Sequence, residues 1–147
     1  MMLRDLLTKD TILLNVKARD WENVTDIAGK MLLDTDAIEP HYIEAMKDTI
    51  RQLGPYVVIA PGIALLHSRP VNDVKRICMS LVTLDPPIKF GHPNNDPVKI
   101  VVALGGVDEN SHMDALMEIA NILSEEENIT KIIAATTVED IFILFQG

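Results

Sequence analysis

Residues 54–70 read G-P-Y-V-V-I-A-P-G-I-A-L-L-H-S-R-P, two short apolar runs separated by a proline–glycine pair. Short runs rich in β-branched residues favour strands, and a Pro-Gly pair favours a turn between them. The stretch therefore predicts a strand over residues 56–60, a turn, and a second strand over residues 63–66. His67 follows where the second strand leaves the interior. Pro70 has no backbone N–H and cannot extend the strand as a ladder donor.

The rest of the chain adds strand and helix patterns around this stretch. Near-continuous apolar runs over residues 77–84 and 99–104 are typical of central strands, and residues 11–16 also indicate a strand. The spacing of apolar residues predicts helices over residues 1–9, 21–33, 113–123 and 128–134, one from Pro40 to a cap at Gly54, and a last one from Thr137. Residues 85–97 are rich in Pro and Asn and are expected to be irregular.

Strands that are apolar on both faces require helices on both sides of their sheet. We therefore predict an α/β fold, a single mixed β-sheet covered by helices on both faces, with residues 1–147 as one domain. Asp20 and Ser111 are the expected N-caps of two helices, and Pro40 suits the first position of another. The order of the strands does not follow from the pattern.

The composition limits the partners and the location of the protein. Its 147 residues include 13 Lys and Arg against 22 Asp and Glu, so the net charge is −9. Such a surface repels phosphate backbones, which argues against nucleic acid and leaves room for a partner with a basic docking face. No apolar run approaches the roughly 18 residues of a membrane helix. We expect a cytoplasmic protein that is not itself embedded in a membrane.

The sequence leaves histidine to carry any chemistry. It contains no serine-hydrolase, P-loop, dinucleotide-binding or zinc-protease motif. The single cysteine, Cys78, lies inside an apolar run and is expected to be a buried structural thiol. His41, in the first turn of a predicted helix, is expected to be solvated, and His92 fits a surface turn. None of the four histidines is spaced like a metal-binding pair, so no metal is expected.

The other two histidines have positions that suit a functional site. A neutral imidazole can be a nucleophile near pH 7 because its ordinary pKa is about 6.5. His67 either satisfies a strand-end carbonyl group or acts as that nucleophile. His112, at a helix start, is either an exposed residue without a role or a neutral donor to a phosphoryl oxygen beside free backbone N–H groups. The residues alone leave both alternatives open.

Four segments resemble the IIA components of the sugar phosphotransferase system. Residues 54–70 are similar to the active-site segment of the fructose/mannitol group and, within it, of the ascorbate-type branch. Residues 42–46 resemble the family's Y-x-x-x-M helix, and residues 90–92 with 95–98 resemble a loop of the ascorbate-type branch. Ser111-His112, opening a Leu- and Met-rich helix, resembles the second active-site histidine. The likeness covers nearly the whole chain.

The resemblance implies a phosphotransferase that works as a phosphoryl relay. The phosphocarrier HPr would pass its phosphoryl group to His67, and the phosphohistidine would pass it to a IIB component for uptake of a sugar, with an ascorbate-like compound as one candidate. His112 would support the transition state. The further neighbours of the phosphoryl group would be Ser68, Arg69, His92, Asn95 and Asp96. The transfer would need no cofactor and no metal.

The chain also departs from the family pattern. Leu66 and Ser68 flank the active histidine where the family usually has a proline and a small residue. Thr49 stands where many members carry an arginine, a role left to Arg51 or Arg69. Two other functions therefore stay open: a regulatory binding module switched by phosphorylation, or an inactive structural homologue. A IIB and a membrane IIC component encoded beside this chain would favour the relay.

Overall fold

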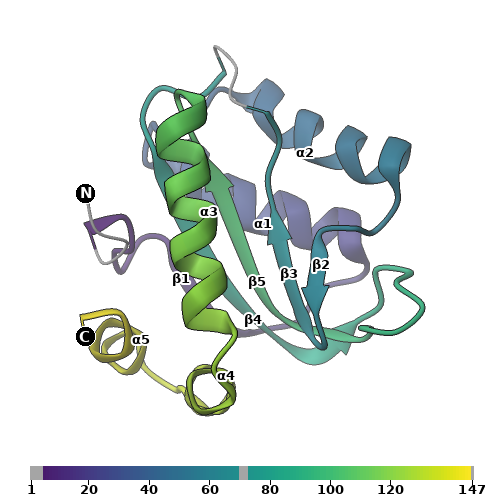
Figure 1. Cartoon of the computed structure of the whole chain (residues 1–147), viewed down its shortest axis with the longest axis vertical. Helices are drawn as coiled ribbons and strands as arrows, with labels where there is room; N and C mark the ends of the chain where they lie inside the picture. The colour runs from purple at the N-terminus through teal and green to yellow at the C-terminus, as the bar shows by residue number, and fades with distance from the viewer. Residues whose placement is uncertain (1–4, 70–72, 147) are drawn as a thin grey trace.

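The computed structural model describes residues 5–69 and 73–146. Its elements follow one another as β1 (Ile12–Val16), α1 (Trp21–Asp34), α2 (Pro40–Leu53), β2 (Val58–Ala60), β3 (Ile63–Leu66), β4 (Cys78–Ile88), β5 (Val98–Gly105), α3 (Glu109–Leu123), α4 (Glu126–Ala134) and α5 (Val138–Gln146) (Figure 1). The predicted pair of strands around the Pro-Gly turn is present as β2 and β3. Gly62 in this turn has a φ of 78°, a left-handed conformation that glycine adopts without steric cost.

The strands form one five-stranded sheet in the order β1-β4-β5-β3-β2. β1 is parallel to β4 and β3 is parallel to β5, whereas the β4–β5 and β2–β3 pairs are antiparallel. The predicted α/β fold with a single mixed sheet is thus confirmed. In the register of β3 on β5, Ile63 lies opposite Ile100 and Leu66 opposite Ala103. Both strands therefore end at the same edge of the sheet.

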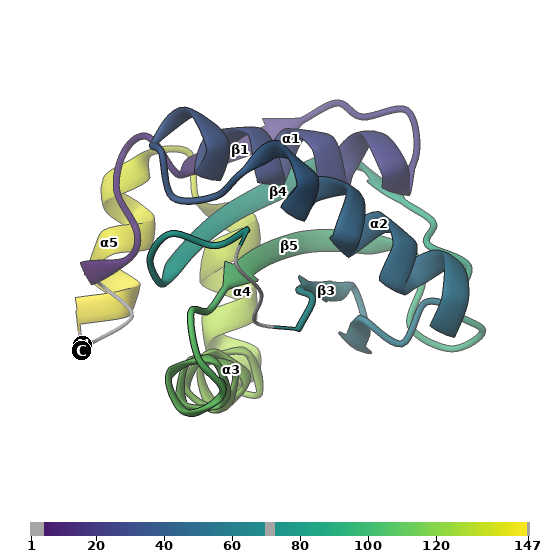
Figure 2. The ribbon, with the colours of Figure 1, turned by 90° about the horizontal axis from the view of Figure 1, so that it is seen from above.

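Helices cover both faces of the sheet (Figure 2). α1 and α2 pack on one face, where Val24 and Tyr42 belong to a buried core. α3, α4 and α5 pack on the other face, where Ile119, Ile132 and Ile141 belong to a second core. From Ile100 to Leu104, successive residues of β5 alternate between these cores because strand side chains point to opposite faces in turn. Within residues 5–69 and 73–146, no helix is long and apolar enough to cross a membrane.

Several predicted helix ends are confirmed. The Asp20 carboxylate accepts a hydrogen bond of 2.8 Å from a backbone N–H in the first turn of α1, so Asp20 is its N-cap. Pro40 is the first residue of α2, and Gly54 ends that helix with a φ of 84°. At the start of α5, Thr137 and Asp140 each accept a hydrogen bond from the other's backbone N–H, which is the reciprocal pattern of a capping box.

Residues 85–97 are not wholly irregular, so that prediction is wrong. β4 continues through its prolines to Ile88, which pairs with Val98 after a shift of register. A bulge of this kind lets a strand contain prolines, which have no backbone N–H to donate to the neighbouring strand. The apolar pattern stops at Leu84 because the residues that follow are exposed or half-buried.

Two helix starts differ from the prediction. The N-cap of α3 is Asp108 instead of Ser111, because the Asp108 carboxylate accepts the Ser111 backbone N–H at 2.8 Å. α4 begins at Glu126, two residues before its predicted start. Residues 5–9 contain no α-helix, and the first four residues of the helix predicted over 1–9 lie outside the described residues.

Cys78 lies at the start of β4 and is only 5% exposed. Its Sγ is 3.8 Å from the carbonyl oxygen of Gly105, on the neighbouring strand β5. Burial raises the pKa of the thiol to about 11, so the reactive thiolate is scarce near neutral pH. The predicted burial of this thiol is confirmed.

Candidate active site

The carboxyl-terminal ends of β3 and β5 bring two histidines together. His67 directly follows β3, while β5 leads through Gly106 and a short turn into α3, which carries His112 near its start. The two strands are parallel neighbours, so their ends meet at one edge of the sheet, where α/β proteins commonly place their sites. The imidazole rings of His67 and His112 are 5.8 Å apart between centroids. The topology thus assembles a histidine pair from distant parts of the chain.

A backbone carbonyl sets the tautomer of His67. The Nδ1 atom lies 2.8 Å from the carbonyl oxygen of Leu65. Because a carbonyl oxygen only accepts, Nδ1 must carry the proton, and the neutral ring holds its lone pair on Nε2. Tyr56 meets the same ring edge to face, at 5.9 Å between centroids and 81° between planes. Nε2 is therefore the nucleophilic atom of this half-buried side chain.

His112 is more buried than an exposed residue at a helix start. Only 7% of it is accessible, so that reading of His112 is wrong. The reason is that α3 already begins at Glu109, which places His112 further into the helix and against Gly106. A Cβ added to Gly106 would lie 2.6 Å from the Cβ of His112, closer than real carbon atoms approach. Glycine at this position is a requirement of the histidine pair.

The surroundings of His112 favour a neutral imidazole. Burial first, and the neighbouring His67 second, lower the pKa of His112 from its ordinary value of 6.5, while Glu109 opposes the shift. Its Nε2 atom is buried and has no hydrogen-bond partner among the described residues. A buried polar atom without a partner carries a desolvation penalty that a bound group can relieve. This nitrogen is available to a group held beside His67.

The two rings lie in a pocket of about 620 Å³. Thr49, Tyr56, Ser68 and Arg69 line it together with both histidines. Of the residues predicted for the site, His67, His112, Ser68 and Arg69 are therefore brought together by the fold. Thr49 comes from α2, which forms one wall, and α3 forms the wall opposite.

Hydroxyl groups of α2 hold Ser68 from two sides. The Ser68 backbone N–H donates to the Tyr42 hydroxyl at 3.1 Å. The Ser68 hydroxyl lies 3.4 Å from that of Thr49, which itself donates to the carbonyl oxygen of Ala45 at 2.9 Å. Since Thr49 stands where many IIA proteins carry an arginine, this wall of the pocket presents hydroxyl groups without a charge.

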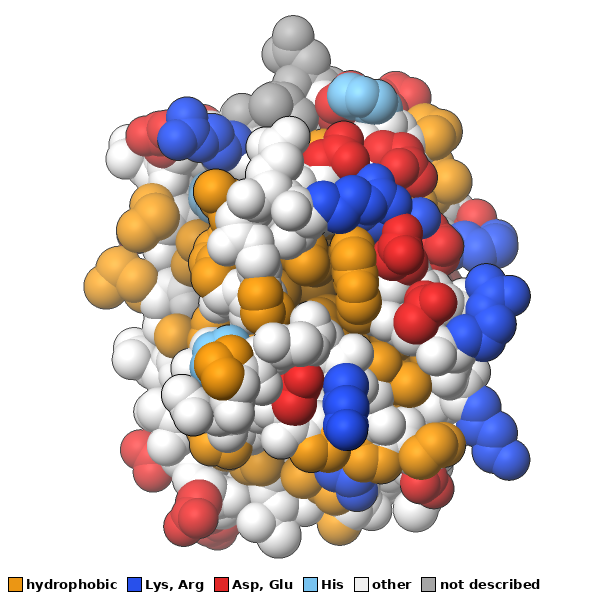
Figure 3. All heavy atoms as spheres, turned by 90° about the vertical axis from the view of Figure 1, so that its right-hand side faces the viewer, with side chains coloured by type: hydrophobic (Ala, Val, Ile, Leu, Met, Phe, Trp, Pro, Cys, Tyr) orange, Lys and Arg blue, Asp and Glu red, His pale blue; other side chains and the backbone are white. Residues whose placement is uncertain are grey.

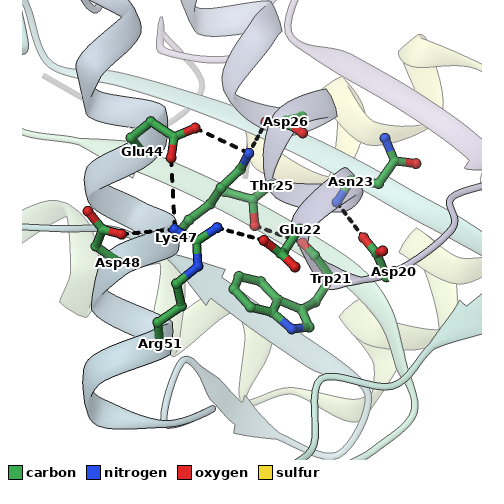
Figure 4. Close-up of polar contacts among 10 residues, drawn as sticks. All are labelled: Asp20, Trp21, Glu22, Asn23, Thr25, Asp26, Glu44, Lys47, Asp48 and Arg51. Atoms are coloured by element: carbon green, nitrogen blue, oxygen red, sulfur yellow. Dashed lines mark hydrogen bonds and ion pairs between the residues drawn. The ribbon is translucent and has the colours of Figure 1, made fainter.

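The two arginines that could anchor an anion have different surroundings. Arg51 is held between α1 and α2, where its guanidinium pairs with Glu22 at 2.6 Å and with Asp48 at 2.9 Å (Figure 4). It also lies 6.0 Å from the centre of the Trp21 ring. Arg69 is exposed and lines the pocket. Arg69 is therefore the arginine placed to meet an anion bound there.

The loop that carries His92, Asn95 and Asp96 lies elsewhere. The backbone N–H of Gly62, just before β3, donates to the Asn95 carbonyl oxygen at 2.8 Å. His67 follows the other end of β3, five residues from Gly62 and therefore about 16 Å away at roughly 3.3 Å per residue (Figure 1). His92, Asn95 and Asp96 are therefore not among the residues that line the pocket of His67 and His112, and their role beside a phosphoryl group stays a prediction.

The side chains of His92 and Asp96 instead hold the backbone of their own loop, while the Asn95 side chain donates to the carbonyl oxygen of Val58 in β2 at 3.1 Å. Nδ1 of His92 accepts the backbone N–H groups of residues 94 and 95. The Asp96 carboxylate accepts those of Phe90 and Gly91, at 3.0 and 2.7 Å. Side-chain hydrogen bonds of this kind are what Asn-, Asp- and Pro-rich loops commonly use to fix a turn.

The sequence pattern misses three contributors to the site. From the sequence, Tyr42 is only the tyrosine of the Y-x-x-x-M helix, Tyr56 is only the first residue of a predicted strand, and Gly106 has no predicted role. A tyrosine inside an apolar helix face is a usable signal, because its buried hydroxyl must find a partner. The roles of Tyr56 and Gly106 depend on distances between elements, which no local pattern contains.

Exposed hydrophobic side chains surround the pocket. Leu53, at the end of α2, is 68% exposed. Met113 and Met117, one turn apart on α3, are 53% and 61% exposed. On the face shown in Figure 3, hydrophobic side chains surround a hollow, and charged side chains of both signs gather beside it. Apolar surface around a reactive group suits the docking of another protein.

A family model accounts for this architecture. The model of the phosphoenolpyruvate-dependent sugar phosphotransferase system, EIIA 2, matches residues 5–147. This chain belongs to that family. As an EIIA chain it is 40% identical, over 143 residues, to the ascorbate-specific PTS system EIIA component of Escherichia coli strain K12, with 96% of this chain and 93% of the relative covered.

Solved EIIA structures share the fold. The mannitol-specific cryptic phosphotransferase enzyme IIA CmtB from Escherichia coli is 32% identical, covers 100% of both chains and superposes with a TM-score of 0.88. The mannitol enzyme IIA from the same organism, solved in complex with phosphorylated enzyme IIB, gives a TM-score of 0.86 at 24% identity over 96% of this chain and 97% of its own. The second likeness shows that the EIIA fold is kept even where the sequences have diverged.

Proposed function

We propose that this EIIA chain accepts a phosphoryl group from HPr on Nε2 of His67 and passes it to a IIB component. The observation that carries the proposal is the hydrogen bond from Nδ1 of His67 to the Leu65 carbonyl, which leaves the Nε2 lone pair beside a buried, neutral His112. A IIB partner is supported by the mannitol relative, which was solved in complex with phosphorylated enzyme IIB. Such a component works in the cytoplasm.

The transfer forms one bond and breaks one. The Nε2 lone pair attacks phosphorus on the phosphohistidine of HPr, and the old P–N bond breaks as the HPr imidazole leaves with its electron pair. The His67 ring then carries positive charge because Nδ1 keeps its proton, and the Leu65 carbonyl dipole stabilises that charge. In the next step a nucleophile of the IIB component attacks the same phosphorus, and the ring of His67 leaves in its neutral form.

The pocket supplies what phosphoryl transfer requires, namely position and charge stabilisation. When Nε2 of His112 carries its proton, it donates to a phosphoryl oxygen that gains negative charge in the transition state. Arg69 supplies positive charge at the mouth of the pocket, and the hydroxyl of Ser68 supplies a further donor. No step requires a cofactor or a metal.

The surroundings of the site point to protein partners and say little about the sugar. Leu53, Met113 and Met117 offer an apolar rim that HPr and the IIB component would contact in turn. The sugar would bind elsewhere in the transport system, so its identity has to come from relatives. The 40% identical ascorbate-specific relative supports an ascorbate-type compound.

The test is phosphorylation by purified enzyme I, HPr and phosphoenolpyruvate. We expect acid-labile phosphate on this chain, lost in His67→Ala and kept in His92→Ala, a matched histidine at the other end of β3. Addition of the IIB component of an ascorbate system should then remove the label. Labelling that persists in His67→Ala contradicts the site, and an unlabelled wild-type chain contradicts the relay.

A further inference from the structure

Tyr42 of α2 joins the two strand ends that form the site. Its side chain is completely buried. The hydroxyl donates to the Leu104 carbonyl oxygen at 2.7 Å and accepts the Ser68 backbone N–H at 3.1 Å. These directions are fixed by chemistry, because a carbonyl oxygen only accepts and a backbone N–H only donates. The hydroxyl is thus satisfied from both sides, and burial raises the pKa of Tyr42, so its proton is retained at all ordinary pH values.

The hydroxyl lies where direct pairing of the strands stops. The register of β3 on β5 ends with Leu66 opposite Ala103. Leu104 lies one residue beyond Ala103 in β5, and Ser68 lies two residues beyond Leu66, the last residue of β3. The Tyr42 hydroxyl therefore bridges the two chain segments where the described residues show no direct backbone pairing. On one side it holds Ser68, the residue that directly follows His67.

The backbone around Ser68 decides where the His67 ring points. The contact between Nδ1 of His67 and the Leu65 oxygen spans only two residues, so it depends on the backbone angles of His67 itself. Those angles are fixed on one side by β3 and on the other by the peptide group of Ser68. Since Tyr42 holds the N–H of that peptide group, it also holds the ring and its proton on Nδ1.

We propose that Tyr42 is a positioning residue of the phosphoryl relay, which keeps the His67 ring in the tautomer whose Nε2 is free to react. Thr49 is a second arm of the same clamp, because its hydroxyl meets that of Ser68 at 3.4 Å. This role rests on the proposed function of His67. It assigns to the α2 helix a chemical task at the site, in addition to covering the sheet.

The test removes one oxygen atom. Tyr42→Phe keeps the ring in the core but cannot bond Ser68 or Leu104. We expect phosphoryl transfer to His67 to slow by about 10- to 100-fold, since a misplacement of about 1 Å can cost that much. We also expect the ¹⁵N chemical shifts of the His67 ring to change from a single Nδ1–H tautomer in the wild type to a mixture of both tautomers.

A matched control separates positioning from stability. Ser80 is also fully buried and donates one hydrogen bond, at 2.8 Å, to the Ala28 carbonyl oxygen on α1, away from the pocket. Ser80→Ala should lower the stability to a similar extent and leave both the transfer rate and the His67 tautomer unchanged. A loss of rate that follows stability alone would appear in both variants.

The tautomer measurement needs no phosphoryl donor, so it tests the clamp even if the relay itself fails. Should Tyr42→Phe not fold, Thr49→Val removes the second arm and is expected to shift the tautomer in the same direction by a smaller amount. A folded Tyr42→Phe chain with the wild-type tautomer and the wild-type rate overturns the proposal, as does an unchanged tautomer in Thr49→Val when that variant alone folds.

Discussion

At the scale of single residues, the reactivity proposed for His67 depends on the carbonyl oxygen of Leu65. This carbonyl holds the proton on Nδ1, and in the proposed relay it would also face the positive charge of the phosphorylated ring. It is itself well fixed, because the Leu65 N–H donates to the Val57 carbonyl oxygen at 2.8 Å. The Tyr56 ring limits rotation of the imidazole from another side. The nucleophile is thus oriented before any partner arrives.

His112 should support the transfer without being phosphorylated. We expect His112→Ala to slow phosphorylation of His67 by on the order of 10²–10³, the usual cost of losing one donor to a transition-state oxygen. His112→Gln keeps a donor of similar reach and should recover part of the rate. Rapid-quench measurement of transfer from HPr decides this. Because His112 is buried, both variants must be compared at a temperature where they are fully folded.

The two arginines should behave differently. Arg69→Ala removes the cation that lines the pocket and should slow the transfer by about tenfold or more, as expected for a charge that stabilises the phosphoryl oxygens. Arg51→Ala breaks ion pairs with Glu22 and Asp48 and should change only the stability, slightly, because exposed ion pairs contribute little. The same rapid-quench assay compares them. Equal losses of rate in both variants would contradict the assignment.

The sequence predicts where His67 lies in the fold, but it does not predict the tautomer of His67 or the burial of His112. A buried run that ends in a histidine is a local pattern, so the end of β3 could be located without a structure. The tautomer depends on side-chain torsions, and the burial of His112 depends on contact with Gly106, which is separated from it by a turn. The predicted site neighbours in the loop around His92 follow from a family likeness that carries no spatial information.

At the scale of elements, α3 is placed by its N-cap. Both the backbone N–H and the hydroxyl of Ser111 donate to the Asp108 carboxylate, at 2.8 and 2.9 Å. These bonds lower the pKa of the Asp108 carboxyl in the folded chain. The cap therefore stabilises the fold at pH values above the ordinary pKa of 3.8, and this stabilisation is lost as the pH falls through the lowered pKa. His112 is the next residue, so the cap that starts the helix also sets the histidine against His67.

Loss of this cap should therefore affect both stability and transfer. Asp108→Ala is expected to lower the melting temperature by a few degrees and to slow phosphorylation of His67, because the first turn of α3 frays. Asp108→Asn, which also caps helices, should restore both. Asp140→Ala at α5 is the matched control, with a lower melting temperature and an unchanged rate. If Asp140→Ala slowed the transfer as much as Asp108→Ala does, the loss of rate would come from lower stability alone.

Element boundaries show where sequence patterns lose information. The start of α3 is predicted three residues late because Ser111 and Asp108 are both good caps, and only the tertiary contact of His112 with Gly106 selects between them. The second half of β4 is missed because prolines mark loops in most sequences, whereas here a shift of register against β5 lets the strand continue to Ile88. The order of the strands is missed because it depends on long-range pairing.

At the scale of the whole molecule, stability should depend on pH through His112. Its pKa is lowered in the folded chain, so the unfolded chain binds the extra proton first and stability falls as the pH drops below about 6.5. His41 acts in the opposite sense, because its contact with Asp73 raises its pKa and favours the folded chain at low pH. His41 contributes equally to the wild type and to His112 variants.

Denaturant unfolding at pH 7.5 and 5.5 measures the effect. We expect the wild type to lose more stability on acidification than His112→Gln does. The variant His41→Ala, which removes the opposing contribution, should lose more than the wild type. Parallel pH dependence of the wild type and His112→Gln would mean that His112 is not held neutral by its surroundings.

The buried Cys78 offers a way to measure local opening at the end of the sheet that carries the histidine pair. Its Sγ lies against β5 just before Gly106, the residue on which His112 packs. Because the single thiol of this chain is largely buried, the rate at which an alkylating reagent labels it rises with the frequency of local opening around the start of β4. The alkylation rates of Cys78 can then be compared between phosphorylated and unphosphorylated chains. A slower rate in the phosphorylated chain would show that the phosphoryl group makes local opening at this end of the sheet rarer.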